Sequence, residues 1–338
     1  MNENTHDVVI VGGGAAGLSA GLVLARARRR VAILDDGAPR NAPAAHMQGF
    51  LTRDGMPPAA LLEAGRAELA GYGVEPIAAR VDEVVREDGP DPVFTVQLTG
   101  GASLRTRRVL VATGLRDEPP DLPGLRERWG KDVLHCPYCH GYEVRDEPIG
   151  VLATGPMAVH QTLMVRQWSP NVTLFTQDQE FSPDDRERFA ARGITVVEGE
   201  VKRIVADEDG LHGVEMADGN VVERRALFVQ SAMIPNDGPL TALGCAREDG
   251  LVRTDGKGRT SVPGVSAAGN VVNTHAQVII AAAEGAAAAM ALNGDLVEED
   301  VRRAVDHDRV TGRSAAEFDA SFEALVAESV LGDRRHGL

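Results

Sequence analysis

The stretch Val8–Gly17, with the sequence VVIVGGGAAG, decides the fold of this chain. Its first four residues are apolar without a break, which is typical of a strand buried on both faces. Its glycines, Gly12, Gly14 and Gly17, have the spacing GxGxxG, and an alanine- and leucine-rich segment of helical periodicity follows, up to Arg28. The stretch therefore predicts a strand, a glycine-rich turn and a helix in direct succession.

A second apolar strand, Val31–Leu34, completes the pattern and ends at Asp35. Strand, loop, helix, strand and terminal acid form, in this order, the βαβ fingerprint of a dinucleotide site. The glycines let a pyrophosphate approach the backbone, the helix N-terminus offers partial positive charge, and the acid binds ribose hydroxyls. We therefore predict a parallel α/β sheet with a bound dinucleotide.

Two later segments each combine a strand with small residues. Val109–Gly114 ends in Ala-Thr-Gly, and Thr260–Asn270 ends in Ala-Gly-Asn. The second leads into an alanine-rich segment, His275–Leu292, for which we predict a helix. The first fingerprint alone does not distinguish FAD from NAD, and these two turns favour FAD.

Two of the three cysteines, Cys136 and Cys139, lie in the segment HCPYCHG. Their spacing brings both sulfurs within reach of a disulfide in one tight turn. At a helix start, unpaired N–H groups also favour the thiolate, the form that attacks disulfides and flavins. A structural disulfide and half of a zinc site are the alternatives, but a structural zinc normally needs a second ligand pair. The sequence contains no such pair, so we predict redox chemistry and no metal.

The composition limits the possible partners. The chain has 338 residues, of which 43% are hydrophobic and 25% charged, and its net charge is -15. This charge argues against nucleic acid and anionic membranes as partners. The N-terminus, MNENTHDVVIVGGG, lacks the regions of a secretory signal. The longest apolar runs are too short or too rich in glycine to span a bilayer. We therefore expect a soluble cytoplasmic protein with room for two domains.

Four motifs in order, the GGGAAG loop, the ATG turn, CxxC and TSVPGVSAAGN, resemble those of the low-molecular-weight thioredoxin reductases over roughly residues 7–294. The resemblance implies an α/β fold of two Rossmann-like, three-layer dinucleotide-binding domains. The FAD-binding domain would be split into residues 1–117 and 240–338. The inserted Rossmann-like domain, residues 118–239, would carry the CxxC motif. The resemblance also implies a homodimer.

The resemblance also implies which residues hold FAD. Asp35 would bind the adenosine ribose, and the segment that contains Gln277 would lie at the isoalloxazine edge. The family usually has Asp where Asn270 stands, so here the hydrogen-bonding group is kept and a charge is lost. The full set implied is Gly12, Gly14, Ala15, Ala16, Gly17, Asp35, Arg40, Asn41, Val81, Ala112, Thr113, Gly114, Gly269, Asn270, Ala276, Gln277 and Val278.

The inserted domain repeats a βαβ pattern, with predicted strands at Ile149–Leu152 and Val172–Phe175 and a helix at Ala158–Gln167. Its turn, Ala153–Ala158, reads ATGPMA where the reductases have GxGxxA. The second strand leads into TQDQE, which has two acids and no arginine to grip a 2′-phosphate. NADPH is therefore an unlikely cofactor in this interpretation. NADH, or a nucleotide bound by an altered loop, stays open.

His140 follows the second cysteine, where thioredoxin reductases usually carry Asp. Histidine titrates near neutrality and both takes and gives a proton. Together with the altered nicotinamide loop, this resembles the FAD-dependent dithiol oxidases of gliotoxin, holomycin and romidepsin biosynthesis. That resemblance implies catalysis by Cys136, Cys139 and His140. It also implies a small-molecule dithiol substrate, such as a dithiolopyrrolone like holomycin, and oxygen as acceptor with hydrogen peroxide as product.

Two other functions stay open from the sequence: an NAD(P)H-dependent thioredoxin or disulfide reductase, and a flavin-bearing redox sensor. His46, His135 and His275 are further candidates beside the cofactor or the cysteines, and Cys245 is interpreted as a packed core residue. Residues 295–338 extend past the resemblance, and an amphipathic helix is predicted there from Phe318, Phe322, Leu325 and Val326.

Overall fold

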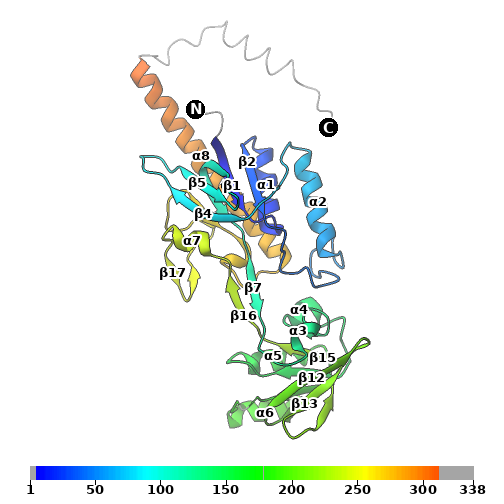
Figure 1. Cartoon of the computed structure of the whole chain (residues 1–338). Helices are drawn as coiled ribbons and strands as arrows, with labels where there is room; N and C mark the ends of the chain where they lie inside the picture. Colours follow the sequence, from blue (N-terminus) through cyan, green and yellow to red (C-terminus); the bar gives the residue numbers. More distant parts are fainter. Residues whose placement is uncertain (1–4, 178, 312–338) are drawn as a thin grey trace. The chain divides into compact units, whose positions relative to one another are not determined.

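The computed structural model describes residues 5–177 and 179–311 (Figure 1). They belong to two compact units, Met1–Leu292 and Asn293–Leu338. The predicted Asp178 acid and the predicted tail helix, with Phe318, Phe322, Leu325 and Val326, lie outside the described residues.

The first sheet of the unit Met1–Leu292 has seven strands in the order β3–β2–β1–β6–β5–β4, with β19 also paired to β6. Its inner strands β2, β1, β6 and β19 are parallel, and β5 and β4 add an antiparallel edge. The strands are β1 (Thr5–Val11), β2 (Val31–Asp35), β3 (Ile77–Ala78), β4 (Val81–Arg86), β5 (Phe94–Leu98), β6 (Ser103–Val111) and β19 (Val265–Ala267).

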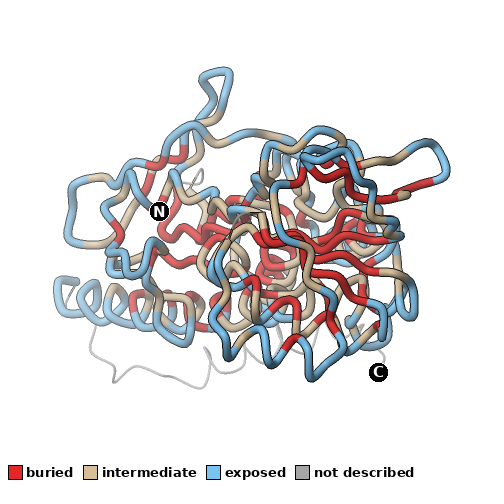
Figure 2. The backbone as a smooth tube through the Cα atoms, turned by 90° about the horizontal axis from the view of Figure 1, so that it is seen from below, coloured by how far each residue is buried: buried red, intermediate tan, exposed pale blue. Residues whose placement is uncertain are grey.

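The predicted double-sided burial of the first strand is confirmed. Val8, Val9 and Ile10 are 0% exposed, because strands at the centre of a parallel sheet are covered on both faces. Figure 2 shows buried residues along the inner runs of the backbone and exposed residues in its outer loops. The predicted α/β class with Rossmann-like parallel sheets is therefore confirmed.

Three helices accompany this sheet: α1 (Ala15–Arg26), α2 (Pro58–Ala70) and α8 (Val278–Thr311). Helix α8 is long and apolar enough to cross a membrane by length and composition alone, which the sequence analysis did not expect. Its first turns pack tightly inside the protein, since a Cβ on Gly285 would lie 2.0 Å from the Ala16 carbonyl oxygen. Close contact between helices explains the small apolar residues of this segment.

A second sheet has five parallel strands in the order β11–β10–β9–β15–β8. The βαβ unit predicted here is confirmed, although its helix α5 (Ala158–Val165) ends two residues before Gln167. The strands are β8 (Val133–Leu134), β9 (Ile149–Leu152), β10 (Val172–Phe175), β11 (Thr195–Val197) and β15 (Ala226–Val229). Helix α6 (Pro183–Ala191) and a three-stranded sheet of β12 (Val201–Asp207), β13 (Gly210–Met216) and β14 (Val221–Glu223) complete this region.

Two crossover strands, β7 (Leu115–Glu118) and β16 (Ala232–Pro235), join the two sheets and pair antiparallel with each other. The predicted domain boundaries, after residue 117 and before residue 240, fall within β7 and within α7 (Gly238–Ala242). The division itself stays a prediction, because contacts keep Met1–Leu292 in one unit. The remaining short elements are α3 (Leu125–Arg128), α4 (Pro137–His140), β17 (Arg247–Glu248), β18 (Leu251–Val252) and the 3-10 turn Gly269–Val271.

Candidate active site

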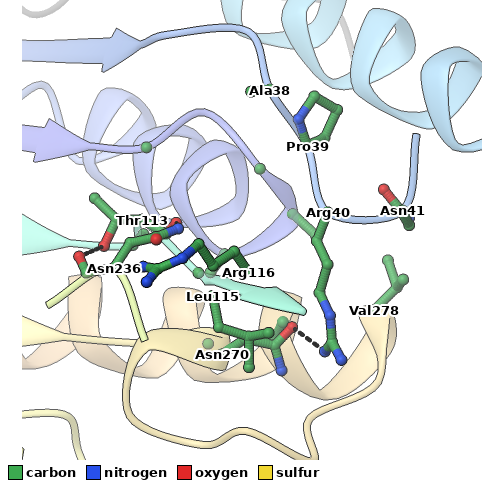
Figure 3. Close-up of a pocket in the computed structure, with 18 of the residues that line it drawn as sticks. Ala38, Pro39, Arg40, Asn41, Thr113, Leu115, Arg116, Asn236, Asn270 and Val278 are labelled. Carbon is green, nitrogen blue, oxygen red and sulfur yellow. Dashed lines mark hydrogen bonds between the residues drawn. The ribbon is translucent and has the colours of Figure 1, made fainter. Parts of the chain in front are cut away.

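A cavity of about 1030 Å³ lies where the glycine-rich loop, the crossover strand β7 and the CxxC segment meet. Small-molecule sites usually measure about 300–1,000 Å³, so this one suits a large ligand. Figure 3 shows part of its lining, with Arg40 and Asn270 directed toward each other. All the residues predicted to hold FAD or to act in catalysis line this cavity except Gly17.

The three fingerprint glycines serve different purposes. Gly12 has φ +109°, and a Cβ there would lie 2.3 Å from the Ala112 carbonyl oxygen. A Cβ on Gly17 would lie 1.8 Å from the Gly12 carbonyl oxygen, so Gly17 serves the packing of the turn instead of lining the cavity. A Cβ on Gly14 would meet nothing within 4 Å. The open space above Gly14 is a cradle for a close-lying ligand.

Asp35 closes β2 beside this loop. Its Oδ1 accepts a hydrogen bond from the Gly13 backbone N–H at 3.1 Å, and its Oδ2 lies 3.5 Å from Arg66 Nη2. The carboxylate therefore stands at the end of the first two strands, where the fingerprint needs a group for ribose hydroxyls.

We expect Gly14→Ala to weaken FAD retention without unfolding the protein. Gly14 has φ −77° and ψ −170°, which alanine adopts freely, and its Cβ would meet no protein atom. The methyl group would instead occupy the space that a pyrophosphate needs. The measurements are the FAD dissociation constant by fluorescence titration and the Tm of the apoprotein.

Gly17→Ala is the matched control, because its Cβ would collide with the backbone of Gly12 and the fold itself should suffer. A Gly14→Ala protein that holds FAD as tightly as the parent would contradict this assignment of the cradle.

The amide of Asn270 explains why this position is not Asp. Its Nδ2 donates to the backbone carbonyls of Asn273 at 2.9 Å, Thr274 at 3.4 Å and Ala276 at 3.0 Å. Three carbonyl acceptors fix the orientation of the amide, and a carboxylate could not donate to any of them. Asn270 therefore shapes the loop that leads into α8 and carries Gln277 to the cavity.

Arg40 links Asn270 to the first crossover strand. Its Nη1 lies 3.5 Å from Asn270 Oδ1, and its Nε and Nη2 donate to the two carboxylate oxygens of Asp117 at 2.7 and 2.8 Å. Ser231 Oγ also donates to Asp117. Burial raises the pKa of Asp117, and the bonds from Arg40 and Ser231 more than offset this, so the pKa is lowered. No sequence motif pointed to Asp117, which lines the cavity.

The cysteine pair forms the predicted disulfide, with 5.3 Å between the Cα atoms of Cys136 and Cys139. Cys136 is the N-cap of α4, and Pro137 occupies the first position of this single helical turn. The turn is held by Trp168, since a Cβ on Gly141 would lie 2.7 Å from its ring. The disulfide and the dinucleotide loop therefore line one cavity.

Two histidines flank the disulfide along the chain. Burial lowers the pKa of His140, and the nearby Glu143 carboxylate acts in the opposite direction. Burial also lowers the pKa of His135, against the effect of Asp117. The buried Nδ1 of His135 has no hydrogen-bond partner among the described residues. Both imidazoles are therefore biased toward the neutral form, which accepts protons.

The remaining candidates separate into two groups. His46 and His275 line the cavity, so both stay candidates for groups beside the cofactor. Cys245 does not line it and is buried in the core, with its Sγ 3.5 Å from Thr260 Oγ1. Burial raises the pKa of this thiol, so it stays protonated and unreactive. Within residues 5–177 and 179–311, no group of three or more His, Cys, Asp or Glu residues could hold a metal ion.

Comparison with known proteins places the chain among flavoproteins. The family described as "Pyridine nucleotide-disulphide oxidoreductase" matches residues 6–286. Thioredoxin reductase tcpT of Claviceps purpurea is 32% identical over 279 residues, covering 79% of this chain and 87% of tcpT. Thioredoxin reductase sirT of Leptosphaeria maculans is 31% identical over 327 residues, covering 87% of this chain and 95% of sirT.

Two solved structures extend this comparison. The crystal structure of HlmI is 59% identical with a TM-score of 0.89, and the match covers 92% of this chain and 98% of HlmI. An oxidoreductase from Agrobacterium tumefaciens is 36% identical with a TM-score of 0.81, covering 87% of this chain and 99% of the other. The similarity to HlmI therefore includes the inserted region that carries the CxxC motif.

Proposed function

Because the chain belongs to the pyridine nucleotide-disulphide oxidoreductase family and is a thioredoxin reductase-like, flavin-dependent thiol–disulfide oxidoreductase, we propose that it oxidises a small-molecule dithiol to its cyclic disulfide. Oxygen is the final acceptor in this proposal. The observation that carries it is the Cys136–Cys139 disulfide in the same cavity as the dinucleotide loop, with His140 beside it. The 59% identity to HlmI supports the assignment.

The residues present fit FAD, which this family binds. The open cradle above Gly14, the Asp35 carboxylate at the strand ends and the size of the cavity suit a dinucleotide. FAD, when bound, takes two electrons from a cysteine pair and passes them to oxygen. We therefore propose that the predicted cofactor residues, which line this cavity except for Gly17, would hold FAD.

The cysteine pair carries the exchange chemistry. One substrate thiolate attacks Cys136 Sγ, so a mixed disulfide forms and Cys139 leaves as a thiolate. The second substrate thiolate then attacks the substrate sulfur of that mixed disulfide, which releases the cyclic disulfide and reduced Cys136. Overall the dithiol loses two electrons and two protons, and oxygen gains both to become hydrogen peroxide.

His140 is the proposed proton acceptor. A thiol is a weak nucleophile until it loses its proton, so the incoming substrate needs a base. His140 lines the cavity next to Cys139, and burial lowers its pKa, which favours the neutral imidazole. It can return the proton to a departing thiolate, as general acid–base catalysis requires.

The inserted region gives no support for NADPH. Ala153 is 1% exposed, and Thr154 Oγ1 donates to the Gln230 carbonyl oxygen at 3.1 Å, inside the turn that should approach a pyrophosphate. After β10, Gln177 has φ +49°, and its Oε1 accepts from the Val201 backbone N–H at 3.0 Å. The side chain at this strand end therefore serves the protein's own backbone. We propose that NADPH is not the electron donor.

To test this proposal, the purified enzyme is incubated with a reduced dithiolopyrrolone and oxygen, without any nicotinamide nucleotide. We expect cyclic disulfide and hydrogen peroxide in equal amounts, and no bleaching of the flavin by NADPH under anaerobic conditions. Product is measured by chromatography, peroxide by a peroxidase-coupled assay and the flavin by its absorbance.

Cys245→Ser is the matched control and should keep full activity, since Cys245 lies outside the cavity. Reduction of thioredoxin disulfide with NADPH or NADH, without peroxide formation from the dithiol, would establish the reductase alternative instead.

A further inference from the structure

The charged side chains that line the cavity fall into two groups. One group lies where β2 ends, because β3 pairs with β2 at Asp35 and the chain then enters β4. Its members are Asp35, Asp36, Arg80, Asp82 and Glu83. The other group lies on β7 and on the loop after β2, and consists of Arg40, Arg116 and Asp117.

Asp117 and Arg40 lie close to the CxxC segment. Burial is the main cause that lowers the pKa of His135, the residue before Cys136. The Asp117 carboxylate acts to raise this pKa and the Arg40 guanidinium acts to lower it, so both charges are near the imidazole. Their neighbours from this segment in the cavity wall are uncharged, and include Trp129, Gly130, Leu134, Cys136 and Cys139.

The charge of Arg40 is compensated within the protein. Its Nε and Nη2 donate to both carboxylate oxygens of Asp117 at 2.7 and 2.8 Å, which is the bidentate bond that an arginine would otherwise offer to an anionic ligand. The two side chains are only 25% and 12% exposed, so water screens the pair weakly. Arg116 is also paired, with Glu118 Oε1 3.0 Å from its Nη2, and Figure 3 shows it pointing away from Arg40.

An anionic thiol therefore finds no compensating charge at the disulfide. Within residues 5–177 and 179–311, the lysine and arginine side chains that line the cavity are Arg40, Arg80 and Arg116. The first and last of these are paired, and Arg80 belongs to the group at the end of β2. Burying a carboxylate without a partner is costly, and the net charge of -15 repels anions before they enter. An uncharged dithiol meets neither obstacle.

Building on the proposed function, we propose that Asp117 is a specificity-determining residue for the oxidation of dithiols. By pairing with Arg40 it neutralises the arginine beside the disulfide, so uncharged dithiols react there and anionic thiols are excluded. Specificity of this kind comes from leaving the wrong ligand with an unpaired charge.

The selection prevents a wasteful side reaction. Glutathione, a tripeptide thiol with two carboxylates, is the usual test case of an anionic cellular thiol. Two glutathione molecules at the disulfide would together lose two electrons and two protons and form one glutathione disulfide. Oxygen would gain both as hydrogen peroxide, without formation of the proper product. An enzyme that keeps its disulfide oxidised for one substrate therefore benefits from rejecting this class of thiol.

The first test compares dihydrolipoamide with dihydrolipoate, two dithiols that differ only in the charge of the terminal group. The readout is the second-order rate constant for anaerobic bleaching of the flavin in the full-length holoprotein, by stopped-flow absorbance. We expect the uncharged dihydrolipoamide to react about tenfold faster or more. The salt concentration is about 0.2 M, where charges on the outer surface are largely screened. Equal rate constants would overturn the proposal.

The second test converts the compensated arginine into a binding group. Asp117→Asn keeps an oxygen that can accept from Arg40 Nη2 and Ser231 Oγ, but it removes the negative charge. Arg40 then becomes an unpaired cation beside the disulfide. We expect the dihydrolipoamide-to-dihydrolipoate ratio of rate constants to fall to about one or below. A merely structural role of Asp117 would slow both substrates alike and leave this ratio unchanged, which would refute the proposal.

Two further variants show whether the effect acts through Arg40. Adding Arg40→Gln to Asp117→Asn removes the cation again and should restore the preference for dihydrolipoamide. Asp184→Asn is the matched control, since it makes the same change at an exposed position of α6 outside the cavity. It should keep the wild-type ratio. An equal change of the ratio in this control would assign the effect to net charge and overturn the role of Asp117.

The measurements also separate this inference from the proposed function. If the flavin is bleached with the expected preference but no peroxide forms in air, the oxidase reaction is wrong and the charge selection stands. If peroxide forms equally fast from both dithiols, the oxidase reaction stands and the charge selection is refuted. Glutathione should bleach the flavin of Asp117→Asn faster than that of the wild type, and the absence of this gain would contradict the role of Asp117.

Discussion

Replacing either Cys136 or Cys139 by serine is expected to abolish dithiol oxidation, with a loss of about a thousandfold or more. Both sulfurs line the cavity and are bonded to each other, and no other described cysteine does so. Serine keeps the volume and hydrogen bonding of the side chain but forms no disulfide. The measurement is the initial rate of peroxide formation from the reduced dithiol.

The two variants should fail in different ways. We further propose that Cys139, the sulfur that leaves as a thiolate in the exchange, is the one that passes electrons to the flavin. In Cys136→Ser the remaining Cys139 thiolate should therefore give a long-wavelength absorption band with the oxidised cofactor. Cys139→Ser should show no such band. If the band appears in the other variant, the roles of the two sulfurs are exchanged. If either variant keeps wild-type turnover, the exchange mechanism is wrong.

His140→Ala is expected to slow turnover by about a hundredfold, the usual scale for a single general acid–base group. The variant should retain FAD, so its flavin absorbance is the check that the site is still assembled. Full activity from pH 6 to 9 would assign the proton transfer to another cavity histidine, His135 or His275.

The pH profile provides a second readout of the same residue. The neutral imidazole accepts the proton, and burial lowers the pKa of His140, so activity should persist below the ordinary pKa of histidine and fall only at lower pH. Glu143 raises this pKa, so Glu143→Gln should move the acid limb to still lower pH. Glutamine can keep the acceptor for Gln48 Nε2, which lies 3.1 Å from Glu143 Oε1, and removes only the charge. A shift toward higher pH would contradict the assignment of His140 as the base.

The sequence predicted the elements that follow a local pattern. The strand Val8–Val11 could be predicted because its apolar run has no polar break. Asp35 could be predicted as a ribose-binding acid because it ends the next strand. These features depend on residues close together in the chain, and the structure places them at one end of the first sheet. The CxxC pair was readable for the same reason.

The residues that join the two parts of the site could not be predicted from the sequence. Arg40 and Asp117 are separated by 77 positions, and their ion pair exists only because β7 passes the loop after β2. The sequence also does not explain why position 270 is Asn and not Asp. The three backbone carbonyls that accept from the Asn270 amide face it only after the loop has formed.

The length of α8 was predicted wrongly. Asn293 and Gly294 follow the predicted helix His275–Leu292 and are typical of a helix end. The helix in fact begins at Val278 and continues to Thr311. A glycine inside a helix costs only about 1 kcal/mol, so Gly294 did not outweigh the alanine-rich turns that precede it.

The place of β19 in the first sheet determines the order in which the chain can fold during synthesis. The five-stranded sheet ends with β15 and is complete once Val229 has left the ribosome. The seven-stranded sheet must wait for Val265–Ala267, which pairs with β6 more than 150 residues after that strand was made. Strand β5 covers only the first part of β6, so the segment Val109–Val111 stays an unpaired strand edge, open to wrong pairing, throughout translation of the insertion.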